Sequence, residues 1–366
     1  MNNYLLCVFS PLIIGAVQLA LTGRPVYTMT GHLSEGQKRK YLIAACFVLF
    51  LFVALRAPFV GSGDGKFYTR NWVAASKIPI SRLSVLLKVD LEKGYLLTVW
   101  LLSHVFHNGQ WVFVFQGAVM MFAVGRFLEQ NCDSPMIGLM AFTSLGLFNF
   151  MIQAVRQSIA ISICLLAISF VKKRKLIPFL LSVALAFTYH GSAVAFLPVY
   201  FLYGRRFRFL DILGFTAVAA LGLYFLPYLF RLMNIAISDS YAANRGTGFE
   251  SGFITILINL SILLMCIILR DKSVPEANAV DNDFYLFMMI AFFIVFLLRY
   301  VFSGIAVRVS YYYMITQAVL IPESLKRMEK NSQFITVCAI MILMALLILH
   351  KASYSTLSPY PFFWQT

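Results

Sequence analysis

The chain has 366 residues, of which 60% are hydrophobic and 12% are charged, whereas an average soluble domain is about 25% charged. With a mean hydropathy of +0.81, it has too little polar surface to be a water-soluble enzyme, a secreted disulfide scaffold or a disordered protein. The net charge of +15 would favour nucleic-acid binding in a soluble protein, but much of it lies in short loops between apolar runs. Nucleic acid is therefore not an expected partner, and the charge indicates membrane orientation instead.

Apolar runs of membrane-spanning length recur along the whole chain, which predicts an all-α, polytopic bundle of about 10–12 transmembrane helices. Residues 1–366 are treated as a single transmembrane domain. The first run has no basic residue before it and no small-residue cleavage site after it, so we expect a retained span rather than a signal peptide. The predicted spans are residues 4–21, 41–60, 110–127, 136–153, 156–171, 209–231, 251–270, 283–302, 306–324 and 333–350.

Two apolar stretches do not fit a simple span. Residues 94–107 are too short to cross a membrane comfortably, and residues 176–203 are interrupted in the middle by the sequence YHGS. Because basic clusters flank 176–203 on both sides, this stretch should cross an even number of times. It is predicted to form two short helices with His190 at the tip between them.

Clusters of Lys and Arg are expected in the cytoplasm, because positively charged loops are retained on that side. They occur at Arg24 and at residues 38–40, 172–175, 205–208, 270–272 and 326–330. Both termini then lie outside, residues 61–108 form an outer-face loop with an interfacial helix, and residues 234–250 form a second outer-face loop. The basic residues between 61 and 94 conflict with this rule, so that loop would need its charge for another purpose.

Arginines near the ends of apolar runs are the second unusual feature. An ionisable side chain inside a span raises the free energy of membrane insertion by about 2.5–3.5 kcal/mol. Each such side chain is therefore expected either to extend to the interface or to have a function. With the orientation above, arginines from five distant parts of the chain meet at the outer face, near His190 and the glycine-rich residues 61–65. These arginines are Arg56, Arg156, Arg231, Arg245, Arg299 and Arg308. Guanidinium groups offer forked donors to paired oxygens, so this pattern predicts a site for a lipid-linked diphosphate.

Each of these residues also has a structural interpretation. Arginines near span ends commonly extend to the lipid headgroups. This alternative applies to Arg56, Arg299 and Arg308. Residues 61–65 could be only a flexible exit turn with Asp64 as a helix cap, and they lack the Gly-Lys-Ser/Thr ending of a nucleotide loop. His190 could cap a turn, and the tyrosines at 311–313 fit an interfacial aromatic belt better than a sugar-stacking platform.

A set of short motifs follows in order along nearly the whole chain. They are Arg56, residues 61–68 (GSGDGKFY), residues 92–95 (EKGY), residues 156–160 (RQSIA), residues 190–193 (HGSA), Arg308 with Tyr311, and residues 359–360 (PY). Together they resemble the EpsG family of Wzy-type polysaccharide polymerases. One departure is Ser62-Gly63 before the aspartate, where family members often carry a Gly-Thr-Asp-type sequence.

The resemblance implies glycosyl transfer at the periplasmic face of the bacterial inner membrane, with a GT-C-like helix arrangement as one option for the fold. The substrates would be undecaprenyl-diphosphate-linked oligosaccharides, both as donor and as acceptor, joined into O-antigen, capsule or exopolysaccharide. Membrane lipids, a chain-length regulator and a flippase are the other implied partners.

The residues are assigned roles on this basis. Predicted catalytic residues are His190, Asp64, Arg156 and Arg308. Predicted substrate-binding residues are Arg56, Gln157, Tyr68, Arg245, Arg299 and Tyr311. Either His190 or Asp64 could be the base that accepts the proton of the attacking hydroxyl. No carboxylate cluster suggests a metal, so neither a metal nor another cofactor is expected.

Other functions stay open at this point. A ligase that moves finished glycan to a lipid core would use the same diphosphate site and differ only in its acceptor. A flippase for the same lipid would need cations at several depths of the bilayer, whereas these arginines are predicted at one face. A non-enzymatic scaffold would tolerate replacement of the outer arginines by lysine or glutamine.

Overall fold

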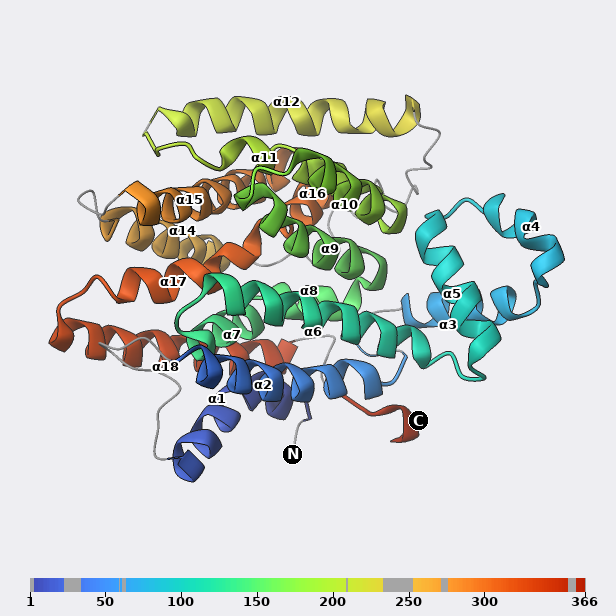
Figure 1. Ribbon diagram of the computed structural model, residues 1–366, viewed down its shortest axis with the longest axis horizontal. Helices are drawn as coiled ribbons and strands as arrows, with labels where there is room; N and C mark the ends of the chain where they lie inside the picture. Colours follow the sequence, from blue (N-terminus) through green and yellow to red (C-terminus); the bar gives the residue numbers. More distant parts are fainter. Residues whose placement is uncertain are drawn as a thin grey trace.

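The computed structural model describes residues 3–22, 34–58, 60, 64–208, 210–232, 253–270, 276–354 and 360–365. Within these ranges the secondary structure is helical, apart from one antiparallel backbone bridge between Arg56 and Phe362. The predicted all-α class is confirmed. Figure 1 shows the longer helices running roughly side by side.

The helices fall into a long and a short group. The long ones are α1 (Asn3–Thr22), α2 (Glu35–Leu55), α6 (Trp111–Asn131), α9 (Val155–Lys172), α12 (Asp211–Leu232), α14 (Phe253–Ile268), α15 (Glu276–Leu297) and α18 (Lys330–Tyr354). The short ones are α3 (Asp64–Ser76), η1 (Ile80–Arg82), α4 (Leu83–Leu87), α5 (Lys93–Val105), α7 (Pro135–Ser144), α8 (Leu147–Gln153), α10 (Leu176–Tyr189), η2 (Gly191–Phe196), α11 (Val199–Leu202), α16 (Arg299–Ser310), η3 (Met314–Thr316), α17 (Gln317–Leu325) and η4 (Phe363–Gln365).

Among the described residues, four helices are long and apolar enough to cross a membrane. They are Asn3–Leu21, Trp111–Asn131, Val155–Lys172 and Asn331–His350. A fifth candidate is the pair α7 and α8, which is bent by 58° at its break, and shorter apolar helices lie among them. The protein is therefore a multi-pass membrane protein.

Two predicted spans are wrong as single helices. Residues 136–153 are split into α7 and α8 because Gly146 takes a φ of 122°, a left-handed conformation that breaks the helix. Residues 306–324 are divided between α16 and α17, since the chain turns at Tyr311 and passes through η3. The predicted break between the spans 283–302 and 306–324 lies at residues 303–305. In the structure the break is earlier, at residue 298, because α15 ends at Leu297 and α16 starts at Arg299.

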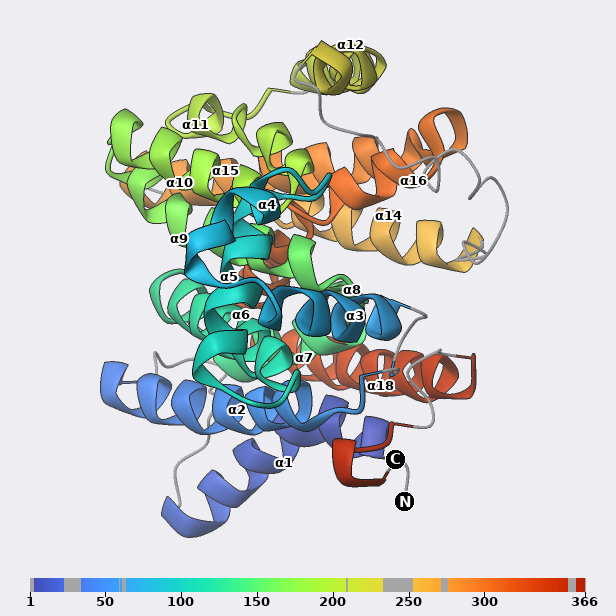
Figure 2. The same cartoon turned by 90° about the vertical axis from the view of Figure 1, so that its right-hand side faces the viewer.

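One end of the bundle gathers basic residues that are held in ion pairs; we call it the basic end. Lys172 Nζ lies 2.5 Å from Asp281 Oδ2, and Arg270 Nε lies 2.7 Å from Asp283 Oδ1. The ends of α9, α14 and α15 are thereby joined. The helices α3, α4 and α5 lie at the opposite end of the molecule (Figure 1), and in Figure 2 they face the viewer.

The α3–α5 segment has an apolar cluster of its own, formed with α6 and the start of α9. Trp72 and Trp100 are buried in it, and Trp100 Nε1 donates to the carbonyl of Ile78 at 2.8 Å. Residues 94–107, predicted as a helix that does not cross, correspond to α5 within this segment. The stretch 176–203 folds as α10 followed by η2 and α11, with His190 between them, as predicted.

The segment at residues 360–362 returns to the end of α2. Ala57 N donates to Pro361 O at 2.9 Å, and Tyr360 Oη donates to Phe52 O at 2.9 Å. Asn3 Nδ2 also donates to Tyr360 O at 2.9 Å. This C-terminal segment therefore joins α1 to the residues that precede the glycine-rich stretch.

Candidate functional site

His190 lies in the turn between α10 and η2 and is buried, with 5% of its surface exposed. Its Nδ1 accepts the backbone N–H of Ser192 at 3.3 Å and lies 2.7 Å from Ser192 Oγ. Ser192 Oγ in turn lies 3.2 Å from the hydroxyl of Tyr312, which comes from the turn after α16. The histidine is therefore held by a buried polar chain that joins two distant parts of the sequence.

Two predicted arginines are near this histidine. Arg156 lies in the first turn of α9 and Arg308 in the last turn of α16. Burial, together with the positive charges of Arg156 and Arg308, lowers the pKa of His190 well below its usual range. The imidazole is therefore neutral at physiological pH, beside two guanidinium groups.

Arg156 is held by the α3–α5 segment. Its Nη1 forms an ion pair with Glu92 Oε2, and both side chains are partly buried. The guanidinium carbon lies 5.4 Å from the centre of the Phe67 ring and 6.0 Å from that of Tyr95. A carboxylate and two aromatic faces thus fix the guanidinium group in one place. Because a phosphate oxygen can accept the same hydrogen bond as the carboxylate of Glu92, a phosphate group is a suitable alternative ligand for Arg156.

Gln157 connects α9 to α16. Its Nε2 donates to the backbone carbonyl of Arg308 at 2.8 Å, and the side chain is almost fully buried. No hydrogen-bond partner within the described ranges is found for its Oε1. The amide of Gln157 therefore binds the backbone that carries Arg308, and its predicted substrate-binding role stays a prediction.

The three tyrosines at 311–313 do not form an interfacial belt, so that interpretation is wrong. The Tyr311 ring stacks on Phe150, with centroids 3.9 Å apart and planes 11° apart. Tyr312 is fully buried against Ser192, and the Tyr313 hydroxyl donates to Ala195 O in η2. These contacts hold η2, and hence His190, against the turn after α16.

Arg56 is separate from this cluster and is one of the most buried side chains, at 2% exposed. Its Nη1 donates to Val60 O at 3.0 Å and its Nη2 to Gln116 Oε1 at 3.3 Å. The guanidinium carbon lies 4.2 Å from the centre of the Phe113 ring. The interpretation that Arg56 extends to lipid headgroups is wrong, because its side chain is buried and both Nη1 and Nη2 donate inside the protein, while its Nε has no hydrogen-bond partner among the described residues.

Of the remaining predicted residues, Tyr68 and Arg299 lie next to residues of the His190 cluster: Tyr68 next to Tyr95, which is beside Arg156, and Arg299 next to Tyr311, which is beside Arg308. Tyr68 is buried in the cluster of α3–α5, with its ring centre 5.9 Å from that of Tyr95. Arg299, 9% exposed at the start of α16, lies 4.9 Å from the Phe296 ring centre. Asp64 begins α3, but its side chain lies outside the described part of the chain, as do Arg245 and the predicted loop 234–250.

Sequence reasoning missed three residues of this cluster. The motifs give no role to Glu92 or Ser192, and the sequence predicts only an aromatic belt for Tyr312. Their neighbours in the sequence carried the motifs, but the pairings span 64 residues for Glu92 with Arg156 and 120 for Ser192 with Tyr312. No local pattern could have revealed them.

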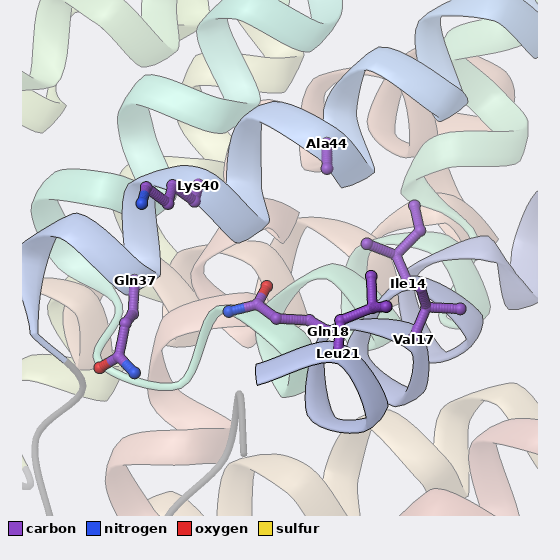
Figure 3. A pocket seen from close by; sticks show the side chains of 7 residues that line it. All are labelled: Ile14, Val17, Gln18, Leu21, Gln37, Lys40 and Ala44. Carbon is purple, nitrogen blue, oxygen red and sulfur yellow. The ribbon is translucent and has the colours of Figure 1, made fainter. Parts of the chain in front are cut away.

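A pocket of about 480 Å³ lies elsewhere, between α1 and α2. It is lined by Ile14, Val17, Gln18, Leu21, Gln37, Lys40 and Ala44. Figure 3 shows its polar side chains on one side and the apolar ones on the other. It contains none of the predicted site residues. Within the residues that the structure describes, no group of three His, Cys, Asp or Glu side chains could hold a metal ion.

Comparison with known proteins identifies the family. The model of the EpsG family matches residues 39–362, which include every motif of the resemblance. Neither the comparison with curated proteins nor that with solved structures gave a match. Because the family model covers most of the chain, the protein belongs to the EpsG family.

Proposed function

We propose that this EpsG family membrane protein, which belongs to a family linked to exopolysaccharide synthesis, is a metal-independent polysaccharide polymerase. The observation that carries the proposal is the convergence of Arg156 and Arg308, from helices far apart in the sequence, on the buried His190. Two guanidinium groups and an imidazole at one place suit a diphosphate better than a neutral ligand.

In the proposed reaction, the nonreducing-end hydroxyl of an incoming lipid-linked repeat unit attacks the anomeric carbon of the growing chain. A C–O bond to the acceptor forms, the C–O bond to the diphosphate breaks, and undecaprenyl diphosphate leaves with the electron pair. Negative charge grows on the leaving diphosphate, so Arg156 and Arg308 stabilise the transition state more than the ground state.

The acceptor's proton must pass to a base, for which Asp64 and His190 are the candidates from the sequence. Glu92 has a different role in this proposal. Because it already pairs with Arg156, it holds the guanidinium in place until phosphate oxygens share or replace it.

The proposed setting is the bacterial inner membrane, with the His190 cluster facing the periplasm. The basic end would face the cytoplasm, in agreement with the positive-inside rule. Membrane lipids, a flippase that delivers the lipid-linked unit and a chain-length regulator are the proposed partners.

A ligase is the main alternative, since it would use the same diphosphate site. A flippase is less well supported, because the arginines of the cluster lie together near His190, whereas a transport path needs cations at successive depths.

The test is a surface-glycan gel from a host that lacks this gene, complemented with wild-type protein, Arg156→Ala or Arg126→Ala. Arg126 is the matched control, because it is an exposed arginine paired with Glu129 on α6. We expect wild type and Arg126→Ala to restore the ladder, and Arg156→Ala to leave single repeat units at the same membrane level. Bare lipid core without single units would show that export or ligation is lost, and the polymerase proposal would fail.

A further inference from the structure

We infer that Ser192 and Tyr312 are positioning residues that lock His190 in the tautomer with its proton on Nε2, so that His190 donates a hydrogen bond and is not the base. The catalytic meaning of this inference rests on the proposed function. The tautomer itself follows from the contacts of the imidazole and can be measured without any activity.

Ser192 N lies 3.3 Å from His190 Nδ1. A backbone N–H can only donate, so Nδ1 must offer its lone pair. A neutral imidazole with a lone pair on Nδ1 carries its proton on Nε2. This long contact favours the tautomer with its proton on Nε2, and the closer hydroxyl of Ser192 adds the second donor that locks it.

The hydroxyl groups of Ser192 and Tyr312 extend this chain of donors. Ser192 Oγ lies 2.7 Å from Nδ1 and, because Nδ1 is an acceptor, the hydroxyl donates to it. The proton of Ser192 is then used, so the Tyr312 hydroxyl, 3.2 Å away, donates to Ser192 Oγ. The chain of donors runs from Tyr312 through Ser192 to His190. All three side chains are buried, where reversing one donor would leave polar groups unsatisfied.

The surroundings of His190 oppose the doubly protonated imidazolium form of its ring. A proton on Nδ1 would face the N–H of Ser192, and the added charge would face the guanidinium groups of Arg156 and Arg308. The Tyr313 hydroxyl, bound to Ala195 O, keeps η2 in place, so the amide of Ser192 cannot easily turn away.

A base needs a free lone pair, and the lone pair of this imidazole is committed to Ser192. His190 instead supplies an N–H beside two guanidinium groups, and a phosphate oxygen of the departing diphosphate would accept it. No proton is transferred in this role. The proton of the attacking hydroxyl must then pass to the other candidate from the sequence, Asp64.

The direct test is nitrogen-15 NMR of the full-length protein with labelled histidine, in which the spectrum of His190→Asn identifies the His190 signals by difference. At about pH 8, where exposed imidazoles are neutral, we expect His190 to be protonated on Nε2 and not on Nδ1. His104 is an internal control for the other tautomer. Its Nδ1 lies 2.9 Å from the carbonyl of Trp100, which can only accept, so Nδ1 of His104 must carry a proton. Protonation of His190 on Nδ1 would overturn the inference.

A second measurement separates a donor from a base. The amide of His190→Gln can donate near the position of Nε2 but cannot accept a proton, whereas His190→Ala can do neither. We expect His190→Ala to slow polymerisation by about 100-fold or more. We expect His190→Gln to keep most of the activity that His190→Ala loses. Equal loss in both variants at matched membrane levels would contradict the donor role.

Ser192 and Tyr312 are tested with the same two readouts. We expect Ser192→Ala and Tyr312→Phe to produce a mixture of His190 tautomers and to lower activity, while Ser192→Thr keeps both at the wild-type level. If the NMR result holds but Arg156→Ala still polymerises, the tautomer lock stands and the proposed function fails. If Arg156→Ala is inactive and Ser192→Ala leaves the tautomer unchanged, only the positioning inference fails.

Discussion

Arg56 and Arg156 show that the surroundings of an arginine, and not its place in the sequence, determine its role. Arg56 and Arg156 both stand next to the end of an apolar helix, and both belong to the motifs of the EpsG resemblance. Arg56 is enclosed and uses its donors on Val60 and Gln116, whereas Arg156 keeps about a quarter of its side chain exposed beside Glu92. The surroundings of Arg56 are therefore those of a structural residue, whereas those of Arg156 suit the substrate role proposed for it.

This difference predicts opposite effects of the same substitution. Arg56→Met leaves the Val60 carbonyl and the Gln116 side chain without a donor, which should cost about 1–3 kcal/mol for each buried group. We expect a clearly lower thermal midpoint in detergent for Arg56→Met, and a near-normal midpoint with lost polymerisation for Arg156→Met. Arg126→Met serves as the exposed control. A normal thermal midpoint for Arg56→Met, together with a lost ladder, would contradict the structural role and support substrate binding by Arg56.

At the scale of elements, the junction between α5 and α10 connects the α3–α5 segment to the His190 cluster. Gly94 approaches α10 so closely that a Cβ there would lie 2.2 Å from Thr188 Oγ1 and 2.9 Å from the carbonyl oxygen of Thr188. Thr98 Oγ1 lies 2.8 Å from the Tyr189 hydroxyl in the same junction. This close approach places Glu92 beside Arg156 and fixes the end of α10 just before His190.

Gly94→Ala should therefore impair function through geometry alone. The added methyl group meets backbone as well as side-chain atoms, so α5 must move away from α10 and carry Glu92 with it. We predict a weaker ladder for Gly94→Ala and a normal one for Gly214→Ala, since a Cβ at Gly214 meets nothing within 4 Å. Surface-glycan gels at matched membrane levels measure this, and an unchanged ladder in Gly94→Ala would show that the junction tolerates displacement.

Much of the arrangement of elements is predictable from the sequence, but not its breaks. Hydropathy places α1, α6, α9 and α18 well, because each has a continuous apolar run. It cannot show that Gly146 adopts a positive φ, or that the chain turns at Tyr311. Those features depend on packing between parts of the chain that are far apart.

The same limit applies to the site. Charge in apolar surroundings predicts Arg156 and Arg308, because burial of a cation always needs an explanation. It does not distinguish Arg56 from them, since the number of donors satisfied inside the protein is a property of the fold. The pairing of Glu92 with Arg156 was invisible for the same reason.

At the scale of the whole molecule, both ends of the bundle carry exposed basic side chains. At the basic end, ion pairs such as Lys172 with Asp281 join helices, while Arg205 is exposed. In the α3–α5 segment the exposed basic residues are Arg70, Lys77, Arg82, Lys88 and Lys93. Each end therefore offers exposed positions for chemical labelling.

Orientation follows as a prediction. In intact cells, a membrane-impermeant maleimide should label Ser81→Cys, next to α4, and should label Arg205→Cys at the basic end only after permeabilisation. Both positions are exposed, while Cys7, Cys46 and the other native cysteines are buried except for Cys338, which is partly buried. The reverse labelling pattern would place the His190 cluster toward the cytoplasm, against the proposed function.

Independence of metal is a further prediction for the whole protein. The arginines of the cluster can neutralise a diphosphate themselves, which is the task that a divalent cation performs elsewhere. We expect membranes that contain the protein to polymerise lipid-linked repeat units at an unchanged rate after treatment with a chelator. A loss of activity that Mg²⁺ or Mn²⁺ restores would contradict this expectation.

The contact of residues 360–362 with the end of α2 has a consequence for biosynthesis. Tyr360 follows Phe52 by 308 residues, which a ribosome translates in about 15 to 60 s at ordinary elongation rates. During that interval the carbonyl of Phe52 and the amide of Ala57 cannot have their final partners. The nascent chain must therefore be inserted almost completely before the region around Arg56 can close, so premature termination would yield a helical membrane protein with this region open.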